Sequence, residues 1–331
     1  MRQPRKEGSV LIVVLLILAA AAYLVMESGK VVRIDYGGAA YQRCMASGGS
    51  LLRSGVDVAR ELLMQDLRKH GDVGDHKFDQ WARADRFFET LSSGLESGEL
   101  AGTIVPENSR INLNHLRQQD ELGKALAGIF LRLMRGLCAT HGVEGNPNVL
   151  LQSIRVWLGA KDLSGDAAWY GDQDPSYAAP RRPFNCAEEL LLVRWEDVSR
   201  EDFQRLYFGR PGAPGLEAFV TVWGEGRLNV NTARSEMLGA MAPEGRYRAE
   251  FVKAVLGFRN NGANNLSEPW YLDLAERIGF DMDAFPSKAL IFRSRYFRVT
   301  LSATIGAGKL GSTTIIKRED KLCRVLFNNV H

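Results

Sequence analysis

The chain has 331 residues, of which 45% are hydrophobic and 24% are charged, and its formal net charge is +3. This composition excludes a disordered chain and a membrane protein with many spans, and so small a net charge gives no electrostatic footprint for nucleic acid. The length allows two domains, or one domain with a large insertion.

The N-terminus combines a short basic leader with an apolar segment. Three basic residues precede Gly8, and residues 9–26 carry no charge. A helix of this length covers most of the hydrocarbon core of a bilayer, and the basic residues indicate that the leader stays cytoplasmic while the rest is exported. Three interpretations fit: a cleaved secretory signal with its cleavage site near residues 20–22, a signal anchor, and a type IV prepilin leader that ends at Gly8.

The helical pattern continues beyond the apolar segment. Apolar residues recur at helical spacing until His70-Gly71-Asp72, where the predicted helix ends. The glycine pairs at 37–38 and 48–49 are points at which this helix is expected to bend. The sequence thus predicts one long N-terminal helix, half in the membrane and half packed on a head domain.

The middle of the chain is mostly helical. Extended chain is expected at 98–114 and a short strand at 218–223. Apolar stripes predict helices at about 116–138, 146–158, 187–193, 200–207, 235–241, 246–259 and 270–278. The polar stretch 161–182 is rich in Asp, Gly and Pro, and we interpret it as a loop.

The C-terminal part changes to a period of two. Apolar and polar residues alternate over 297–305, which indicates a half-buried strand. A glycine-containing turn and two further strands, at 313–317 and 322–327, complete a small antiparallel meander. The predicted fold class is α+β: a long N-terminal helix and a small antiparallel sheet, interrupted by a large, mostly helical insertion.

Six short motifs stand out when they are taken in chain order. They are the leader that ends at Gly8, followed by Val13 where most pilins and pseudopilins have glutamate; R-I-N-L-N at 110–114; P-S-Y at 175–177 with R-P-F at 182–184; E-E-L at 188–190; L-N-V-N-T-A at 228–233; and S-R-Y-F at 294–297. In this order they resemble the K subunit, the large minor pseudopilin of type II secretion systems.

The resemblance implies a type IV pilin-like fold and a division of the chain. Residues 1–8 are then the leader and 9–30 the transmembrane part of the long helix. The rest of that helix and the first strands of the pilin head occupy 31–112. The inserted helical domain covers 113–286, in two parts of about 113–225 and 231–286, and the C-terminal strands of the head cover 287–331.

The resemblance also implies a non-enzymatic role. In the family, the K subunit assembles with minor pseudopilins of the I and J classes into a complex that caps a periplasmic filament. That complex is thought to start filament assembly and to contact exported cargo. For this chain the expectations are cleavage between Gly8 and Ser9 by prepilin peptidase with methylation, a single-pass anchor in the inner membrane and a periplasmic head. The expected partners are other pseudopilins and a secreted cargo protein, and no nucleic acid.

Val13 suits a position at the filament tip. In pilins and most pseudopilins, the glutamate at this place is thought to neutralise the N-terminal amine of a neighbouring subunit inside the apolar filament, and its absence is what the K class shows. A buried charge without such a partner is costly. A subunit that carries Val13 cannot make this pairing and is suited to a special place in the filament.

Family members bind calcium in a region that corresponds to an acidic loop of this chain. Asp162, Asp166, Asp172 and Asp174 supply oxygen ligands of the kind that calcium takes. The D-W-x-D-x-D of the family is, however, V-W-L-G-A-K here, at 156–161. A solvated polar loop without an ion is therefore the alternative, and no other cofactor is expected.

The two Asn-x-Asn segments precede helical stretches. We expect Asn114, and Asn231 or Thr232, to be helix N-cap residues. Residues 229–259 also resemble a helix-hairpin-helix DNA-binding module, which makes an exported DNA-binding protein the alternative function. Its connection at 243–245 reads Pro-Glu-Gly, whereas the motif needs Gly-x-Gly to meet phosphate.

Four cysteines lie on the exported side and permit two disulfides. The pairing expected first is Cys138 with Cys186 and Cys44 with Cys323, and buried free thiols are the alternative. The sequence contains no P-loop, nucleophile elbow or HExxH motif, and its five histidines are scattered. No catalytic residue is predicted.

Overall fold

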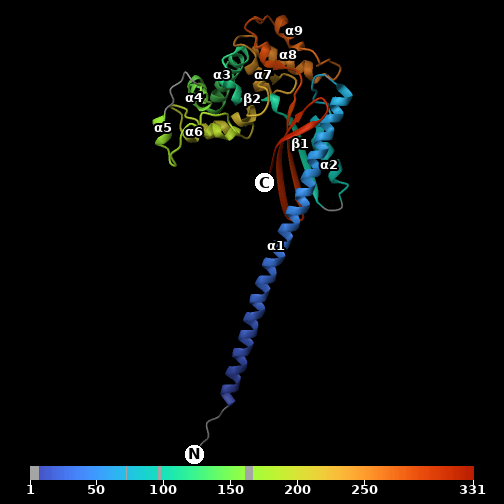
Figure 1. The fold of residues 1–331 in the computed structure, drawn as a ribbon, viewed down its shortest axis with the longest axis vertical. Coiled ribbons are helices and arrows are strands. Elements are labelled where there is room, and N and C mark those ends of the chain that lie inside the picture. The colour runs from blue at the N-terminus through green and yellow to red at the C-terminus, as the bar shows by residue number, and fades with distance from the viewer. Residues whose placement is uncertain (1–6, 72, 96–97, 161–166) are drawn as a thin grey trace, which may run out of the picture.

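The computed structural model describes residues 7–71, 73–95, 98–160 and 167–331. Its longest element is α1 (Glu7–His70), which projects from the head as a continuous shaft (Figure 1). The predicted end of this helix at His70 is confirmed. The glycine pairs lie within the helix without ending it, because each glycine costs a helix only about 1 kcal/mol relative to alanine.

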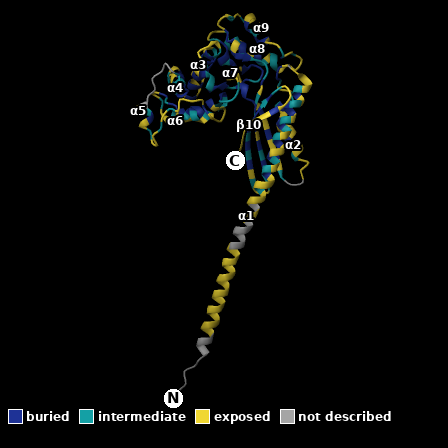
Figure 2. Ribbon diagram, viewed as in Figure 1, coloured by how far each residue is buried: buried dark blue, intermediate teal, exposed yellow. Residues whose placement is uncertain are grey.

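The two halves of α1 have different surroundings. The segment Leu11–Lys30 has a mean hydropathy of 2.5, and none of it is buried (Figure 2). Within the described residues it is the one helical segment long and apolar enough to cross a membrane. Further along the same helix, Leu52, Ala59 and Leu63 are buried against the head.

The head is built on a four-stranded antiparallel sheet in the order β1-β8-β9-β10. Its strands are β1 (Glu99–Pro106), β8 (Tyr296–Ile305), β9 (Gly308–Arg318) and β10 (Cys323–Val330). The predicted C-terminal meander is confirmed. β9 is longer than the predicted 313–317 because residues 308–312 also pair with β8.

A helical segment between α1 and β1 was not predicted from the sequence. It consists of the 3₁₀-helix η1 (Trp81–Arg83) and α2 (Ala84–Ser92). Trp81 and Phe88 are buried in the same core as α1 and the sheet. α2 packs closely against β1 at Gly102, where a Cβ atom would lie 2.8 Å from the Phe88 ring.

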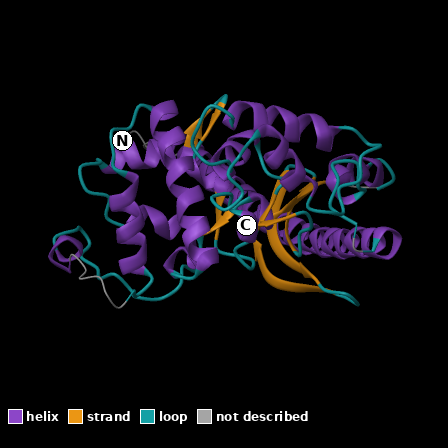
Figure 3. Ribbon diagram, turned by 90° about the horizontal axis from the view of Figure 1, so that it is seen from above, coloured by secondary structure: helices purple, strands orange, loops and turns teal. Residues whose placement is uncertain are grey.

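Between β1 and β8 the chain forms a large, mostly helical insert, which lies at the end of the shaft remote from the N-terminus (Figure 1) and, seen from above, beside the sheet (Figure 3). Its helices are α3 (Glu121–His141), α4 (Pro147–Trp157), α5 (Ala167–Gly171), α6 (Arg200–Phe208), α7 (Ser235–Met241), α8 (Arg248–Asn260) and α9 (Trp270–Ile278). The 3₁₀-helices are η2 (Glu107–Ser109), η3 (Leu113–Arg117), η4 (Ala187–Leu192), η5 (Leu216–Phe219) and η6 (Ser287–Ala289).

Short strand pairs bind distant parts of this region together. β2 (Ile111–Asn112) pairs in parallel with β5 (Val220–Thr221), β6 (Leu228–Asn229) pairs in parallel with β7 (Leu290–Ile291), and β3 (Gly209–Arg210) pairs with β4 (Ala213–Pro214). One continuous hydrophobic core runs through both predicted parts of the insert, and it is separate from the core under the sheet.

Two local predictions differ from the structure. Residues 187–192 form a 3₁₀-helix instead of an α-helix. The stretch interpreted as a loop contains the short helix α5, where Tyr170 is buried among Trp157, Trp169 and Tyr177. Aromatic packing therefore orders a segment whose composition is typical of a loop.

Candidate functional site

The residues predicted to matter for export lie at the start of α1. Gly8 and Ser9 are in the first turns of the helix, and Val13 is in its exposed apolar part, with 51% of its surface accessible. Val13, which stands where most pilins and pseudopilins have glutamate, therefore lies on a helix surface that the head does not cover.

The first Asn-x-Asn segment fastens the insert where it leaves the sheet. The side-chain amide of Asn112 donates to the carbonyl of Gly224 at 2.8 Å. Asn114 bonds the backbone of Phe184 in both directions: its amide donates to the carbonyl, and its oxygen accepts the N–H. One short motif thus joins three segments that lie far apart in the sequence.

The second segment does the same at the other end of the insert. Asn229 donates to Asp75 at 2.7 Å and to Ser294 at 2.8 Å. Asn231 donates to the carbonyls of Leu266 and Phe292, and its oxygen accepts the indole N–H of Trp270. These bonds connect the insert to β7 and to the segment that follows α1.

The predicted N-caps are therefore wrong. Asn112, not Asn114, caps η3. Arg234 is the N-cap residue of α7 and makes no side-chain cap bond. The physical reason is competition, because a cap needs the side-chain oxygen as acceptor, and the oxygens of Asn114 and Asn231 already accept the N–H of Phe184 and the indole N–H of Trp270.

A buried ion-pair cluster lies under the end of α1. Arg318 of β9 is almost fully buried and donates to Asp66 at 2.8 Å, to Asp75 at 2.9 Å and to the carbonyl of Ser294. Burial raises the pKa of the Asp75 carboxyl, while Arg318 and Ser294 act in the opposite direction. The cluster joins the helix, the following segment and the sheet at one point.

Asp79 and His70 border this cluster. His70 Nδ1 lies 2.9 Å from Asp66 Oδ1, and Asp79 accepts the backbone N–H of His76 at 2.7 Å. Burial, and secondarily the charge of Asp66, raises the pKa of Asp79 to about 7.

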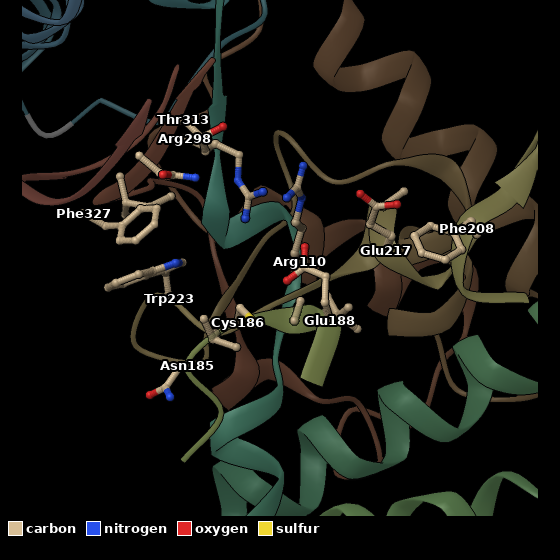
Figure 4. Close-up of a pocket in the computed structure, with 17 residues that line it drawn as sticks. Arg110, Asn185, Cys186, Glu188, Phe208, Glu217, Trp223, Arg298, Thr313 and Phe327 are labelled. Carbon is tan, nitrogen blue, oxygen red and sulfur yellow. The ribbon is translucent and has the colours of Figure 1, made fainter. Parts of the chain in front are cut away.

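A cavity of about 590 Å³ separates the outer face of the sheet from the insert (Figure 4). The guanidinium groups of Arg110 and Arg298 lie side by side in it, at 3.7 Å and 2.6 Å from a carboxylate oxygen of the buried Glu107. Burial lowers the pKa of Arg110. Trp223 and Phe327 form an apolar wall, with their ring centroids 5.8 Å apart.

The edge strand β10 continues this wall. It carries four large apolar side chains that are each about 40% exposed: Val325, Leu326, Phe327 and Val330. Isolated apolar side chains on a surface are ordinary, but a contiguous group on a strand edge is typical of an interaction site.

The predicted calcium ligands are not tested by the structure. Asp162 and Asp166 lie outside the described residues, and Asp172 and Asp174 lie at the exposed end of the same loop. The calcium site stays a prediction.

All four cysteines are free thiols in the structure; the positions of Cys44 and Cys323 argue against their predicted pairing, whereas the pairing of Cys138 with Cys186 stays a prediction. Cys44 lies on α1 beside Gly308, at the start of β9. Cys323 of β10 pairs with Arg318, at the other end of β9, and its carbonyl accepts a hydrogen bond from Arg60. Arg60, which contacts Cys323, lies sixteen residues beyond Cys44 on α1, at a distance of about 24 Å. Cys44 and Cys323 are therefore too far apart for a disulfide. Cys138 is buried on α3, whereas Cys186 is exposed and lines the cavity.

The stretch that resembles a DNA-binding module carries Arg246, Arg248, Lys253 and Arg259, of which Arg246 and Lys253 are exposed and the other two are partly buried. Arg259 donates to the backbone carbonyls of Val230, Asn231 and Ala233, and burial lowers its pKa to about 10. Two nitrogen atoms of the Arg248 side chain are also buried, but they have no hydrogen-bond partner among the described residues. Arg259 therefore helps to hold the insert together.

Several residues of the junction were not singled out from the sequence, among them Asp66, Asp75, Arg318, Glu107 and Arg298. No local pattern marks them, because their partners are up to 252 residues away. The Asn-x-Asn motifs were the one visible signal of this junction.

Comparison with known proteins agrees with this architecture. Residues 109–207 match the family described as type II secretion system protein K. One chain in the crystal structure of the GspK-GspI-GspJ complex from the enterotoxigenic Escherichia coli type 2 secretion system has the same fold, with a TM-score of 0.61 and 18% identity. The match covers 88% of this chain and 96% of that one. No curated protein matches the sequence. The family match and the shared fold confirm that this chain resembles the K subunit, the large minor pseudopilin of type II secretion systems.

Proposed function

We propose that this protein is a non-enzymatic minor pseudopilin that works at the tip of a periplasmic endopilus in a type II secretion system. The observation that carries the proposal is the build of α1. One uninterrupted helix has an apolar half that no described residue of the head covers and a second half that belongs to the head core. Such a helix is suited to serve first as a membrane anchor and then as a packing element in a filament.

The position of the insert supports the tip. It lies at the end of the shaft remote from the N-terminus (Figure 1). A filament subunit that followed in this direction would meet the insert, whereas subunits below can pack against α1. Val13 agrees with this position, because the first subunit of a filament has no preceding subunit whose amine needs a carboxylate.

The proposed partners are minor pseudopilins of the I and J classes, other pseudopilins of the filament and a secreted cargo protein. The solved relative comes from a complex of three such subunits. In this chain the apolar edge of β10 and the cavity beside it are the surfaces best suited to a neighbouring head, and the insert is the part placed to meet cargo. Through these contacts the protein would help to start filament assembly.

The same proposal requires cleavage by prepilin peptidase between Gly8 and Ser9, with the anchor in the inner membrane and the head in the periplasm. N-terminal sequencing of the mature protein tests it, and we expect a chain that begins at Ser9. A Gly8→Val variant should keep its leader, while the matched variant Gly29→Val in the exposed part of α1 should be cleaved normally. A mature start near Tyr23 would instead identify a secretory signal.

The role in secretion is tested by deleting the gene. Loss of cargo secretion and of endopilus assembly, with both restored by the wild-type gene, is the expected result. If secretion and filament assembly both continued unchanged, the proposed role would be wrong.

A further inference from the structure

We propose that Asp66, His70 and Asp79 form a binding site for a divalent transition metal ion of the zinc class. Each residue offers one ligand atom, and the three atoms lie within 4.8 Å of one another. The site is at the end of α1, far in sequence from the predicted calcium loop. It goes beyond the proposed function and does not depend on it.

The spacing of the ligand atoms suits one ion. Ligands about 2.1 Å from a metal lie about 3.0 to 3.4 Å apart in octahedral or tetrahedral arrangements. His70 Nδ1 and Asp66 Oδ1 are 2.9 Å apart. Four residues separate them on α1, which places both on one face of the helix. Asp79 comes from the segment after α1, so an ion would join the shaft to that segment.

Contacts behind the ligands hold the carboxylates in place. Asp66 Oδ2 accepts a hydrogen bond from Arg318, which leaves Oδ1 to face His70. Asp79 is held by the N–H of His76. Outer contacts of this kind fix the orientation of metal ligands and commonly decide metal affinity.

The local charge also calls for a cation. Asp66, Asp75 and Asp79 lie in one cluster, and Arg318 is shared between the first two. Arg68 and Lys69 are the arginine and lysine residues that line the cavity beside the three ligands. Arg68 pairs with Glu61, and Lys69 is exposed. A divalent ion between Asp66 and Asp79 would compensate the excess negative charge of a largely buried group.

An ion can reach this place from solvent. The three ligands line an open cavity of about 460 Å³, and 40% of the His70 side chain is exposed. Water can then fill the remaining coordination positions. An imidazole with two carboxylates favours zinc-class ions over calcium or magnesium, which prefer oxygen ligands alone.

The test uses the full-length chain in detergent, stripped of metal with a chelator. We expect added Zn²⁺ to raise the melting temperature and to bind with one equivalent per chain, while Mg²⁺ leaves the melting temperature unchanged. Added Co²⁺ should give the visible absorption of a nitrogen and oxygen site without a sulfur-to-cobalt band.

Variants assign the site. His70→Ala and Asp79→Asn should each weaken Zn²⁺ binding at least tenfold. The matched controls His115→Ala and Asp85→Asn, which change a histidine and an exposed aspartate elsewhere, should bind as the wild type does. Three outcomes would overturn the proposal: no response to Zn²⁺, equal binding by site and control variants, or a sulfur-to-cobalt band that assigns the metal to the cysteines.

Discussion

Arg318 is the single residue on which the junction of helix, sheet and insert depends most. Its guanidinium donates hydrogen bonds to two buried carboxylates and one carbonyl. Because Arg318 is buried, water does not reach these groups to take over the bonds. A buried pair of this kind contributes little relative to an apolar core, but removal of one partner leaves uncompensated charge.

We therefore predict that Arg318→Met destabilises the head by about 3–5 kcal/mol. The measurement is urea unfolding of the full-length protein in detergent, followed by tryptophan fluorescence. Arg324→Met is the control, because Arg324 is an exposed residue whose ion pair with Glu319 is 3.6 Å long, and such pairs contribute at most about 1 kcal/mol. Equal losses in the two variants would show that the buried cluster carries no special stability.

The cysteines give a second prediction at this scale. Burial raises the pKa values of Cys138 and Cys323 to about 11, so only about one thiol in a thousand is ionised at pH 8, and the thiolate is the reactive form. Cys186 is exposed, although partial burial raises its pKa as well.

Without reductant, we expect iodoacetamide at pH 8 to label Cys186 before Cys138 and Cys323, which should react only after unfolding. Mass spectrometry of peptides reads the order directly. Recovery of Cys138 and Cys186 as one cross-linked peptide would instead support the predicted disulfide.

Residue-level prediction from the sequence was partial for a physical reason. The two Asn-x-Asn motifs can be recognised in the sequence because they repeat the same short pattern. Their predicted role as helix N-caps came only from the residues next to them in the sequence. Their actual partners, such as Phe184 and Leu266, are brought near only by the complete fold. Arg318 and Asp66 carry no local signal at all.

At the scale of elements, α1 contains glycines in two environments. A Cβ atom at Gly38 would meet nothing within 4 Å. At Gly55 it would lie 2.8 Å from a methyl group of Leu301 and 3.3 Å from one of Leu100. The helix therefore needs glycine at the second position to lie close to the sheet.

We expect Gly55→Ala to destabilise the head by about 1–3 kcal/mol, as overpacked cores do, while Gly38→Ala leaves the melting temperature unchanged and gains up to about 1 kcal/mol of local helix propensity. Thermal unfolding and circular dichroism of the isolated chain check both. A Gly55→Ala protein as stable as Gly38→Ala would mean that helix and sheet have room to separate.

Long periodic elements were predicted well, and short ones were not. The ends of α1 and of the helices from α6 onward agree within a few residues, because their apolar stripes span two turns or more. The segment η1–α2 was missed, since it offers only Trp81, Ala84 and Phe88 to the core and has no side-chain cap. Two-residue strands such as β2 and β6 have no period to detect.

At the scale of the whole molecule, two cores share one chain. The sheet core contains α1, and the insert core is closed by elements between β2 and β7. The Asn-x-Asn bonds and the Arg318 cluster join them, so the insert is held at a fixed place at the end of the shaft. A rigid insert can block a filament position, whereas a loosely tethered one would move aside.

This rigidity predicts where the protein lies in an assembled endopilus. A short epitope inserted after Gly212, in the exposed turn between β3 and β4 of the insert, should be labelled by gold-conjugated antibody at one filament end only. The reason is steric, since a further subunit cannot occupy the space beyond the insert. The same epitope on the principal filament subunit is the control and should be labelled along the whole length. Labelling of the Gly212 epitope along the filament would show that the insert swings clear and that the tip position is wrong.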